Sequence, residues 1–206
     1  GAPEYRLSEE SGPPHDRQFR FQVLIEGQLA GEGQGRSKKI AQQAAAARAL
    51  DLLETLPFVR KGRYGAIGHS LGGHNAIYTA VFDQRIKVIV SSCGFDSFSD
   101  YYGGDPAHWQ PERGWCQTHY MPKLTEYRGR LAEIPFDFHE LLGALAPRTV
   151  FINAPLGDSN FRARSVDEVV AAAATGDYLY VGYAEDAAGT GFSLTADPTR
   201  GVRLTR

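Results

Sequence analysis

The chain has 206 residues, 42% of them hydrophobic, and a formal net charge of −2 at pH 7. A chain of this length forms one domain or two small ones. The near-neutral charge excludes a chain-wide signature of nucleic-acid or membrane binding, so either function would have to rest on a local patch. No apolar run approaches the roughly 18 residues of a membrane span. Two cysteines, Cys93 and Cys116, are too few for a disulfide framework and lack metal-site spacing. We therefore expect a soluble, cytoplasmic protein with no metal and no cofactor.

Residues 1–54 predict an α+β unit. Short strands are expected at residues 4–8 and 19–25, the second with alternating apolar side chains, and a third strand is expected at residues 28–33. An Ala-rich run that extends to Leu53 favours a helix, and Ser37 stands where the N-cap should be. The predicted order is three strands followed by a helix.

These residues resemble a double-stranded RNA-binding domain, most closely the type attached to ribonuclease III. The likeness is carried by Pro-Glu-Tyr at 3–5, Gly-Pro-Pro-His at 12–15, Gly-Glu-Gly at 31–33 and Gly-Arg-Ser-Lys-Lys at 35–39. The resemblance implies that Lys38 and Lys39 hold phosphates across the major groove, and that His15 lies in a loop that enters a minor groove. The segment departs from the family in two ways, because Gln42 replaces the third basic residue of the helix motif and the family's first helix is absent before Pro3. The alternative interpretation of the two lysines is a solvated helix start.

Residues 67–73, Ile-Gly-His-Ser-Leu-Gly-Gly, organise the middle of the chain. A short apolar run at residues 64–67 precedes them and a helix-like run at residues 74–82 follows. A strand, a Gly-x-Ser-x-Gly turn and a helix are the context of a nucleophile elbow, so Ser70 is the candidate nucleophile. Gly68 and Gly72 are expected to flank it because the turn leaves no room for Cβ atoms.

The residues after the elbow predict a parallel sheet with helices between its strands. Residues 86–91 and 149–153 are apolar runs typical of buried parallel strands. Helices are expected at residues 138–145 and 166–174. Residues 95–133 are rich in Gly, Tyr, Trp and Pro and are too long for an ordinary loop, which predicts a lid with helical pieces. Strands that alternate with helices predict an α/β fold with right-handed crossovers.

This part resembles an α/β-hydrolase, similar to the dienelactone hydrolase and acyl-esterase branches. Besides the elbow, the likeness is carried by Ser-Ser-Cys-Gly-Phe-Asp at 91–96, Ile-Pro-Phe-Asp-Phe at 134–138, Ala-Pro-Arg at 146–148 and Ala-Pro-Leu-Gly-Asp at 154–158. The resemblance implies a small acyl ester as substrate, with Ser70 as nucleophile and Asp158 as the triad acid. The backbone N–H of Leu71 would be an oxyanion donor. The match covers the second half of the fold, and the early strands that supply the other oxyanion donor are missing.

The triad base is not found. In this fold the catalytic His follows the last strand, and the sequence has no His after His139. We interpret His69, His74, His119 and His139 as structural. Without a base the serine hydroxyl stays protonated and is a weak nucleophile, so little or no esterase activity is predicted.

Two further groups of residues have competing interpretations. Asp96, Asp100 and Asp105 with His108 suggest a metal site, but their spacing fits no standard loop, and scattered carboxylates are usually solvated. The aromatic residues of the expected lid would line a pocket, stack on bases, or form the lid's own small core, which is the interpretation we favour. These residues are Tyr101, Tyr102, Trp109 and Trp115.

Residues 175–206 match neither family. Strands are expected at residues 177–183 and 192–195, and the segment would form a hairpin. A half sheet that starts at residue 64 leaves a strand of buried type with an open edge. We expect strands of the first or the closing segment to cover this edge, or the protein to self-associate through it.

The sequence thus predicts an α/β fold in three segments, with a βββα unit at residues 1–54. A hydrolase-like half domain is expected at 55–174, with its lid at 95–133, and a β-rich segment at 175–206 is expected to complete or cover the sheet. The first hypothesis is a composite chain, natural or artificial, with little or no esterase activity at Ser70. The alternatives are double-stranded RNA binding through His15, Lys38 and Lys39, and a folded chimera with no specific biochemical function.

Overall fold

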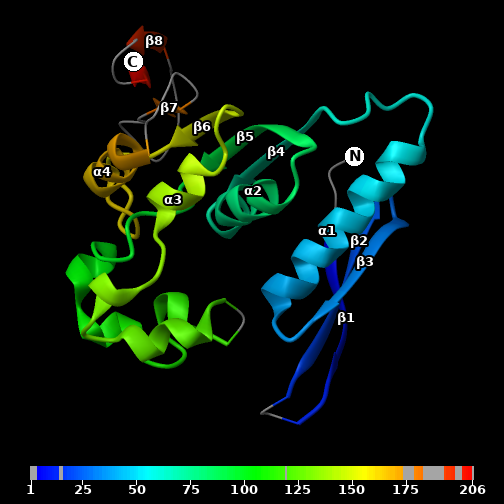
Figure 1. Ribbon diagram of the computed structural model, residues 1–206, viewed down its shortest axis with the longest axis horizontal. Coiled ribbons are helices and arrows are strands. Elements are labelled where there is room, and N and C mark those ends of the chain that lie inside the picture. Colours follow the sequence, from blue (N-terminus) through cyan, green and yellow to red (C-terminus); the bar gives the residue numbers. More distant parts are fainter. Residues whose placement is uncertain are drawn as a thin grey trace. The chain divides into compact units, whose positions relative to one another are not determined.

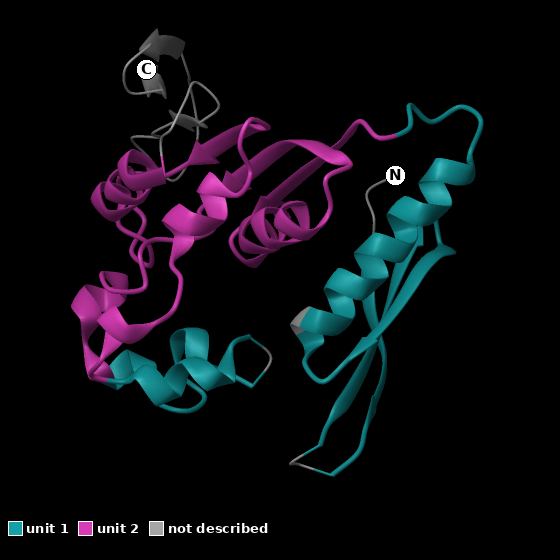
Figure 2. Cartoon of the chain, in the orientation of Figure 1, with its two compact units in different colours: residues 1–61, 107–128 teal, residues 62–106, 129–206 magenta. Residues whose placement is uncertain are grey.

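The computed structural model describes residues 4–13, 16–118, 120–173, 179–182, 193–197 and 201–205. The chain divides into two compact units (Figure 2): residues 1–61 with 107–128, and residues 62–106 with 129–206. No helix in the part of the chain that the structure describes combines the length and the hydrophobicity needed to cross a membrane.

The first unit begins with an antiparallel sheet covered by one helix. Its strands are β1 (Glu4–Ser11), β2 (Gln18–Ile25) and β3 (Gln28–Gly35), in that order, and α1 (Lys38–Thr55) packs on β2 and β3 (Figure 1). The alternation in β2 turns Phe19, Phe21 and Val23 toward the helix, where they are 2%, 6% and 2% exposed. The predicted βββα order is confirmed.

Small residues bring α1 close to the sheet. A Cβ atom at Gly33 would lie 2.2 Å from the backbone nitrogen of Ala45, so only glycine allows this approach. On the helix, Ala41, Ala45 and Ala49 are buried in the same core. The N-cap prediction is also confirmed, because the Ser37 hydroxyl accepts a hydrogen bond from the N–H of Ile40 at 3.2 Å.

The expected lid is built from short 3₁₀ helices. These are η1 (Tyr101–Gly104), η2 (Pro106–Trp109), η3 (Gly114–Cys116), η4 (Pro122–Tyr127) and η5 (Leu131–Glu133). Trp109 and Trp115 are 0% and 6% exposed, which agrees with a core role for the two tryptophans. Tyr102 is 44% exposed and lies outside such a core.

The second unit contains a parallel sheet in the order β4-β5-β6-β7. The strands are β4 (Tyr64–His69), β5 (Ile86–Ser92), β6 (Thr149–Asn153) and β7 (Leu179–Gly182). The helix α2 (Leu71–Phe82) packs on β4 and β5, and α3 (Phe138–Gly143) contacts α2 and α4 (Ala163–Ala173). The closing strands β8 (Ser193–Asp197) and β9 (Gly201–Thr205) pair with each other. The predicted hairpin between residues 177–183 and 192–195 is wrong, because β7 pairs with β6 in the parallel sheet instead.

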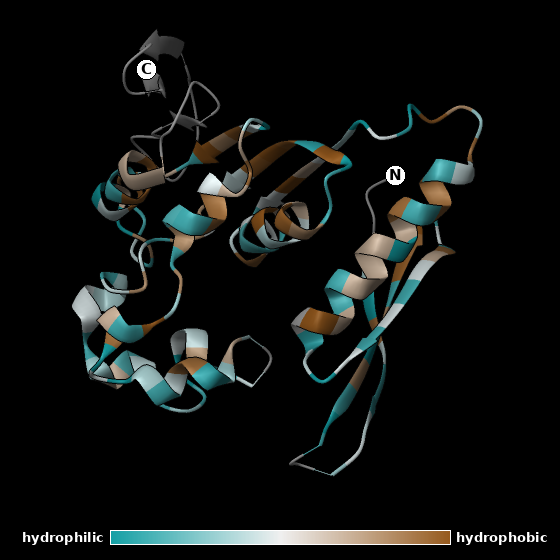
Figure 3. Ribbon diagram, viewed as in Figure 1, coloured by the Kyte–Doolittle hydropathy of each residue, from teal (hydrophilic) through white to brown (hydrophobic). Residues whose placement is uncertain are grey.

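The two faces of the parallel sheet differ. Ile89, Val150 and Ile152 are at most 2% exposed on one face, whereas Ile67 is 80% and Val88 46% exposed on the other. These strands are nonetheless largely hydrophobic (Figure 3). Parallel strands are normally buried on both sides.

The described strands of the closing segment do not pair with the open edge at β4. The strand β7 joins the opposite edge beside β6, and no strand among the described residues pairs with the outer side of β4. The expectation that the closing segment pairs there therefore does not hold for its described strands, whereas covering by the first segment stays a prediction. Self-association through this edge stays a prediction.

Arg148 connects three elements of the second unit. Its guanidinium donates hydrogen bonds of 2.5–3.3 Å to the backbone carbonyl oxygens of Ala80, Asp83, Ile86, Ala144 and Leu145. These carbonyls belong to the end of α2, the start of β5 and the turn after α3. Burial lowers the pKa of Arg148, and the nearby Asp83 carboxylate raises it. The side chain therefore satisfies carbonyls that helix ends leave without partners.

We expect Arg148→Met to lower the free energy of unfolding by about 2 kcal/mol, because it strands several half-buried carbonyls at once. Urea unfolding followed by circular dichroism measures the change. Arg164→Met is the matched control, since Arg164 is 90% exposed and pairs with Glu168 one turn away. A pair of this kind contributes roughly 0.3–0.5 kcal/mol. Equal effects of the two substitutions would contradict the assigned role of Arg148.

Candidate functional site

Ser70 occupies a strained turn between β4 and α2. Its backbone has φ 52° and ψ −119°, a conformation that L-residues rarely adopt. Its N–H donates to the Ser92 carbonyl oxygen at 2.8 Å, which fixes the turn on the neighbouring strand. The side chain is exposed, and its hydroxyl has no hydrogen-bond partner among the described residues. Local geometry is thus that of a nucleophile elbow.

The glycines around Ser70 do not all have the predicted reason. A Cβ atom at Gly68 would lie 2.1 Å from the backbone of Gly72, which confirms the expectation for Gly68. A Cβ atom at Gly72 would meet nothing within 4 Å, so the steric explanation is wrong there. The second tight position is Gly73, whose Cβ would lie 2.9 Å from the Ser91 hydroxyl.

Three polar side chains form a row across the carboxyl ends of β4, β5 and β6. His69, Ser92 and Asn153 are register partners on consecutive strands. The Asn153 amide donates to the Ser92 hydroxyl at 3.0 Å, and that hydroxyl lies 3.1 Å from Nδ1 of His69. His69, interpreted from the sequence as structural, thus takes part in a side-chain hydrogen bond at the end of the strands. The signal that would have revealed it is the shared strand register, which single-sequence patterns do not contain.

Asp158 follows β6 at the same end of the sheet. Its Oδ1 accepts hydrogen bonds from the N–H groups of Asn160 at 2.8 Å and Phe161 at 3.2 Å. Burial raises the pKa of the Cys93 thiol, and the adjacent Asp158 carboxylate raises it further. Asp158 and Cys93 are therefore neighbours. Ser70, Cys93 and Asp158 thus lie at the same end of the sheet, where the carboxyl ends of β4, β5 and β6 meet.

The described histidines have other partners. His74 is 2% exposed and stacks on Tyr78 with ring centroids 4.6 Å apart, which confirms its structural interpretation. His139 lies 3.0 Å from the Glu140 carboxylate. His119 lies outside the described residues. Among the described residues, no His imidazole is hydrogen-bonded to the Ser70 hydroxyl, so the assignment of Ser70, Leu71 and Asp158 as a catalytic set stays a prediction.

Leu71 is the first residue of α2. The first N–H groups of a helix have no acceptor within the helix. The Leu71 N–H is thus placed, by its position in the chain, where an oxyanion donor of an elbow belongs.

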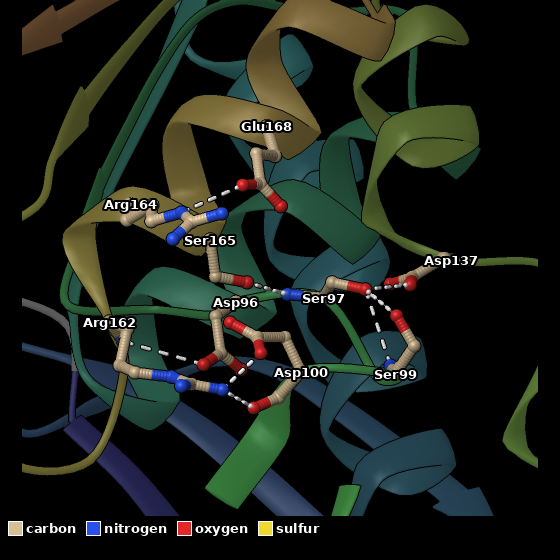
Figure 4. Close-up of polar contacts among 9 residues, drawn as sticks. All are labelled: Asp96, Ser97, Ser99, Asp100, Asp137, Arg162, Arg164, Ser165 and Glu168. Carbon is tan, nitrogen blue, oxygen red and sulfur yellow. Dashed lines mark hydrogen bonds and ion pairs between the residues drawn. The ribbon is translucent and has the colours of Figure 1, made fainter. Parts of the chain in front are cut away.

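Asp96 is a fully buried carboxyl in the stretch after β5. It is 0% exposed, its Oδ2 accepts a hydrogen bond from the Arg162 N–H at 3.3 Å, and its Oδ1 has no partner among the described residues (Figure 4). Burial raises the pKa of Asp96 to about 7; the Arg162 N–H opposes this shift, and the charges of Asp100 and Asp137 add to it. The expectation that the carboxylates of this stretch are solvated is wrong for Asp96.

The surrounding hydrogen bonds join the stretch after β5 to two helices. The Ser97 N–H donates to the Ser165 hydroxyl at 3.1 Å, and the Ser97 hydroxyl donates to Asp137 at 2.6 Å (Figure 4). Asp137 also begins α3 in a capping box with Glu140. Within the described ranges no group of three or more His, Cys, Asp or Glu residues is arranged to hold a metal ion. The cluster around Asp96 is therefore an anchor between loop and helices.

The start of α1 carries the residues expected to contact RNA. Lys38 is the first residue of α1, and no acidic residue lies in the first helical turn. The Lys38 ammonium lies 5.6 Å from the centre of the Phe19 ring and 3.8 Å from the Glu10 carboxylate. Lys39 is the next helical residue, and its side chain lies outside the description. His15 lies outside the described residues.

Two family models match the chain. Residues 1–53 match the double-stranded RNA binding motif, and residues 28–182 match the model described as glucuronyl esterase, fungi. Both resemblances in the sequence are thus confirmed, and the hydrolase-like part corresponds to a glucuronyl esterase. The two matches share residues 28–53, which hold β3 and most of α1.

Known proteins repeat this division. Ribonuclease 3 of Enterococcus faecalis is 60% identical over 47 residues, which are 23% of this chain and 20% of the relative. The chain spans only 20–21% of the length of such curated relatives. A glucuronoyl esterase from Solibacter usitatus has a TM-score of 0.57 at 27% identity, over 72% of this chain and 36% of that one. The glucuronoyl esterase catalytic domain from Hypocrea jecorina has a TM-score of 0.58 at 17% identity, over 71% of this chain and 45% of that one.

We expect the burial of Asp96 to make stability fall with rising pH. The folded state keeps the proton up to about pH 7, whereas the unfolded state loses it near pH 4. Wild-type protein should therefore lose stability across this window relative to Asp96→Asn, by roughly 2–4 kcal/mol from the equivalence of 1.36 kcal/mol per pKa unit. Urea unfolding of both proteins between these pH values measures the difference.

The control for this comparison is Asp105→Asn, which removes an exposed carboxylate from the same stretch. Its stability relative to wild type should change little with pH. A difference between Asp96→Asn and wild type that stays constant across the window would contradict a protonated Asp96.

Proposed function

We propose that double-stranded RNA binding is the principal activity of this chain, which belongs to the fungal glucuronyl esterase family and carries a double-stranded RNA-binding motif in residues 1–53. The observation that carries the proposal is the start of α1. Ser37 caps the helix, Lys38 and Lys39 open it, and its first turn is free of acidic residues. A helix N-terminus with two lysines attracts phosphate through its dipole and through charge.

The likeness to ribonuclease 3 supports the same interpretation. Proteins of the double-stranded RNA-binding type recognise the shape of A-form RNA through phosphate and 2′-hydroxyl contacts. In this chain Lys38 and Lys39 would hold phosphates across the major groove, and His15 would lie at a minor groove. Residues 1–54 hold eight acidic and seven basic side chains, so a concentrated local patch must supply the attraction.

A weak serine hydrolase activity is the second candidate, favoured by the backbone conformation of Ser70. The Ser70 hydroxyl would attack an ester carbonyl, the Leu71 N–H would hold the oxyanion, and Asp158 would be the acid. The family suggests glucuronyl esters as the substrate class. No described His imidazole is hydrogen-bonded to the Ser70 hydroxyl, and a serine without a base is a weak nucleophile, so we propose little or no turnover.

The segment boundaries and the composite origin belong to the same proposal. We infer that residues 1–54 and 55–174 are segments of different ancestry, joined at α1, where the two family matches overlap. The esterase match extends to residue 182, so the start of the segment 175–206 belongs with the second of them. The third interpretation, a folded chimera without a specific activity, would hold if neither RNA nor ester binding were measured.

Replacing Lys38 and Lys39 together with Ala should weaken binding to an RNA duplex of about 20 base pairs, longer than the roughly 16 base pairs that one such domain spans. We expect at least a tenfold loss, and a salt slope of the association constant that falls by about 2, one for each phosphate contact. Fluorescence anisotropy between about 50 and 200 mM salt measures both. The double variant Lys61→Ala/Lys87→Ala, with two exposed lysines elsewhere, is the control. Equal binding by both double variants would exclude this RNA interface.

Wild type and Ser70→Ala should hydrolyse p-nitrophenyl acetate and a methyl glucuronate at the same background rate, because no described His is placed to act as the base for Ser70. Labelling by a fluorophosphonate probe checks the same point without turnover. Ser92→Ala is the control, since Ser92 has a His partner at this edge. Labelling or hydrolysis that is lost in Ser70→Ala and kept in Ser92→Ala would show an active nucleophile.

A further inference from the structure

Glu10 forms a bridge between Arg17 and Lys38, at the end of the antiparallel sheet where α1 starts. One carboxylate oxygen of Glu10 forms an ion pair with Arg17, and the other lies 3.8 Å from the Lys38 ammonium. The side chains of Glu10, Lys38 and Arg17 are 32%, 34% and 44% exposed. The carboxylate is therefore accessible from solvent, and so are both of its partners.

The position of this bridge follows from the strand register. Glu10 is opposite Phe19 in the β1–β2 pair, and the Lys38 ammonium lies 5.6 Å from the centre of the Phe19 ring. Phe19 itself is 2% exposed and belongs to the core. The ring and the carboxylate together hold the ammonium against the sheet. The neighbouring Arg36 is also paired, with its Nε 3.9 Å from Asp16.

We propose that Glu10 competes with an RNA phosphate for the Lys38 ammonium. Glu10 thereby sets the RNA affinity and the salt dependence of the interface. This inference rests on the proposed RNA-binding function. An ammonium paired with a carboxylate must give up that partner, or share it, before it binds a phosphate. A phosphate at Lys38 would also lie near the negative charge of Glu10, and like charges at this distance repel. Both effects lower the affinity for RNA.

The ion pairs of Glu10 should add little to the stability of the fold, so its effect on RNA binding can be measured separately from an effect on folding. Ion pairs between exposed side chains contribute about 0–1 kcal/mol to stability. Glu10→Gln keeps the size and polarity of the side chain and removes the charge, so the variant should fold like wild type. Its effect should appear in RNA binding.

The experiment compares RNA affinity and salt slope for wild type, Glu10→Gln and Glu9→Gln in the full chain. Glu9 is the matched control, because it is the adjacent residue of β1, carries the same charge and pairs with Arg20 instead. We expect Glu10→Gln to bind the RNA duplex about threefold or more tightly than wild type, with a salt slope steeper by up to about 1. The RNA affinity of Glu9→Gln should stay within about twofold of wild type, since Glu9 pairs with Arg20 and not with Lys38, and exposed ion pairs are weak.

A second comparison places Glu10→Gln in a Lys38→Ala background. The gain in affinity should shrink there, because the ammonium for which Glu10 competes is gone. Binding by Glu10→Gln but not by wild type would also support the competition. Equal affinities of wild type, Glu10→Gln and Glu9→Gln would overturn the role of Glu10 and leave RNA binding standing. Absence of RNA binding in wild type and Glu10→Gln alike would overturn both proposals, and thermal unfolding shows whether each variant is folded.

Discussion

The close contact of β4 with α2 at Gly68 is the constraint on which the second unit depends. No side chain fits at Gly68, because a Cβ atom there would lie 2.1 Å from the backbone of Gly72, and a Cβ atom at Gly73 would lie 2.9 Å from the Ser91 hydroxyl. The helix therefore starts directly against the strand that precedes it, and Ser70 must complete the turn at φ 52°. Its N–H is then fixed on β5 through the Ser92 carbonyl oxygen. The same contact brings α2 onto β4 and β5, where its end is satisfied by Arg148. Backbone packing, before any side-chain chemistry, thus determines the geometry of the elbow.

In the first unit a comparable approach has a different outcome. Gly33 and the alanines of α1 allow helix and sheet to meet closely, and this places the helix start beside the end of β1. Lys38 then lies between a core ring and the Glu10 carboxylate. A position that favours anions by helix dipole is thereby partly neutralised by the protein itself. The motif supplies the site, and a residue on another strand adjusts its strength.

Much of this fold was predictable because local sequence patterns determine it. The alternation at residues 19–25, the cap at Ser37 and the apolar runs at 86–91 and 149–153 all became the expected elements. What failed depends on residues far apart in the chain. The burial of Asp96 follows from its contact with Arg162, 66 residues later, and Arg148 reaches Ala80 across 68 residues. The steric role assigned to Gly72 belongs to Gly73, since the pattern shows where glycines stand but not which neighbour each one meets. The bridge of Glu10 to Lys38 was equally invisible, because register decides it.

The elbow separates ancestry from activity. Its strain persists because Gly68, Gly73 and the hydrogen bond to Ser92 over-determine the turn, and none of these depends on a catalytic base. The backbone of a nucleophile can therefore be kept although its hydroxyl has no hydrogen-bond partner in the described part of the chain. The neighbouring hydroxyl of Ser92 shows the contrast, because it has a His within 3.1 Å but sits on a regular strand with no elbow around it. Among the described residues, the strained backbone is thus found at Ser70 and the hydrogen-bonded His at Ser92. Nucleophilic catalysis needs both on the same residue, so the fold of this unit is evidence for its family and not, by itself, for turnover.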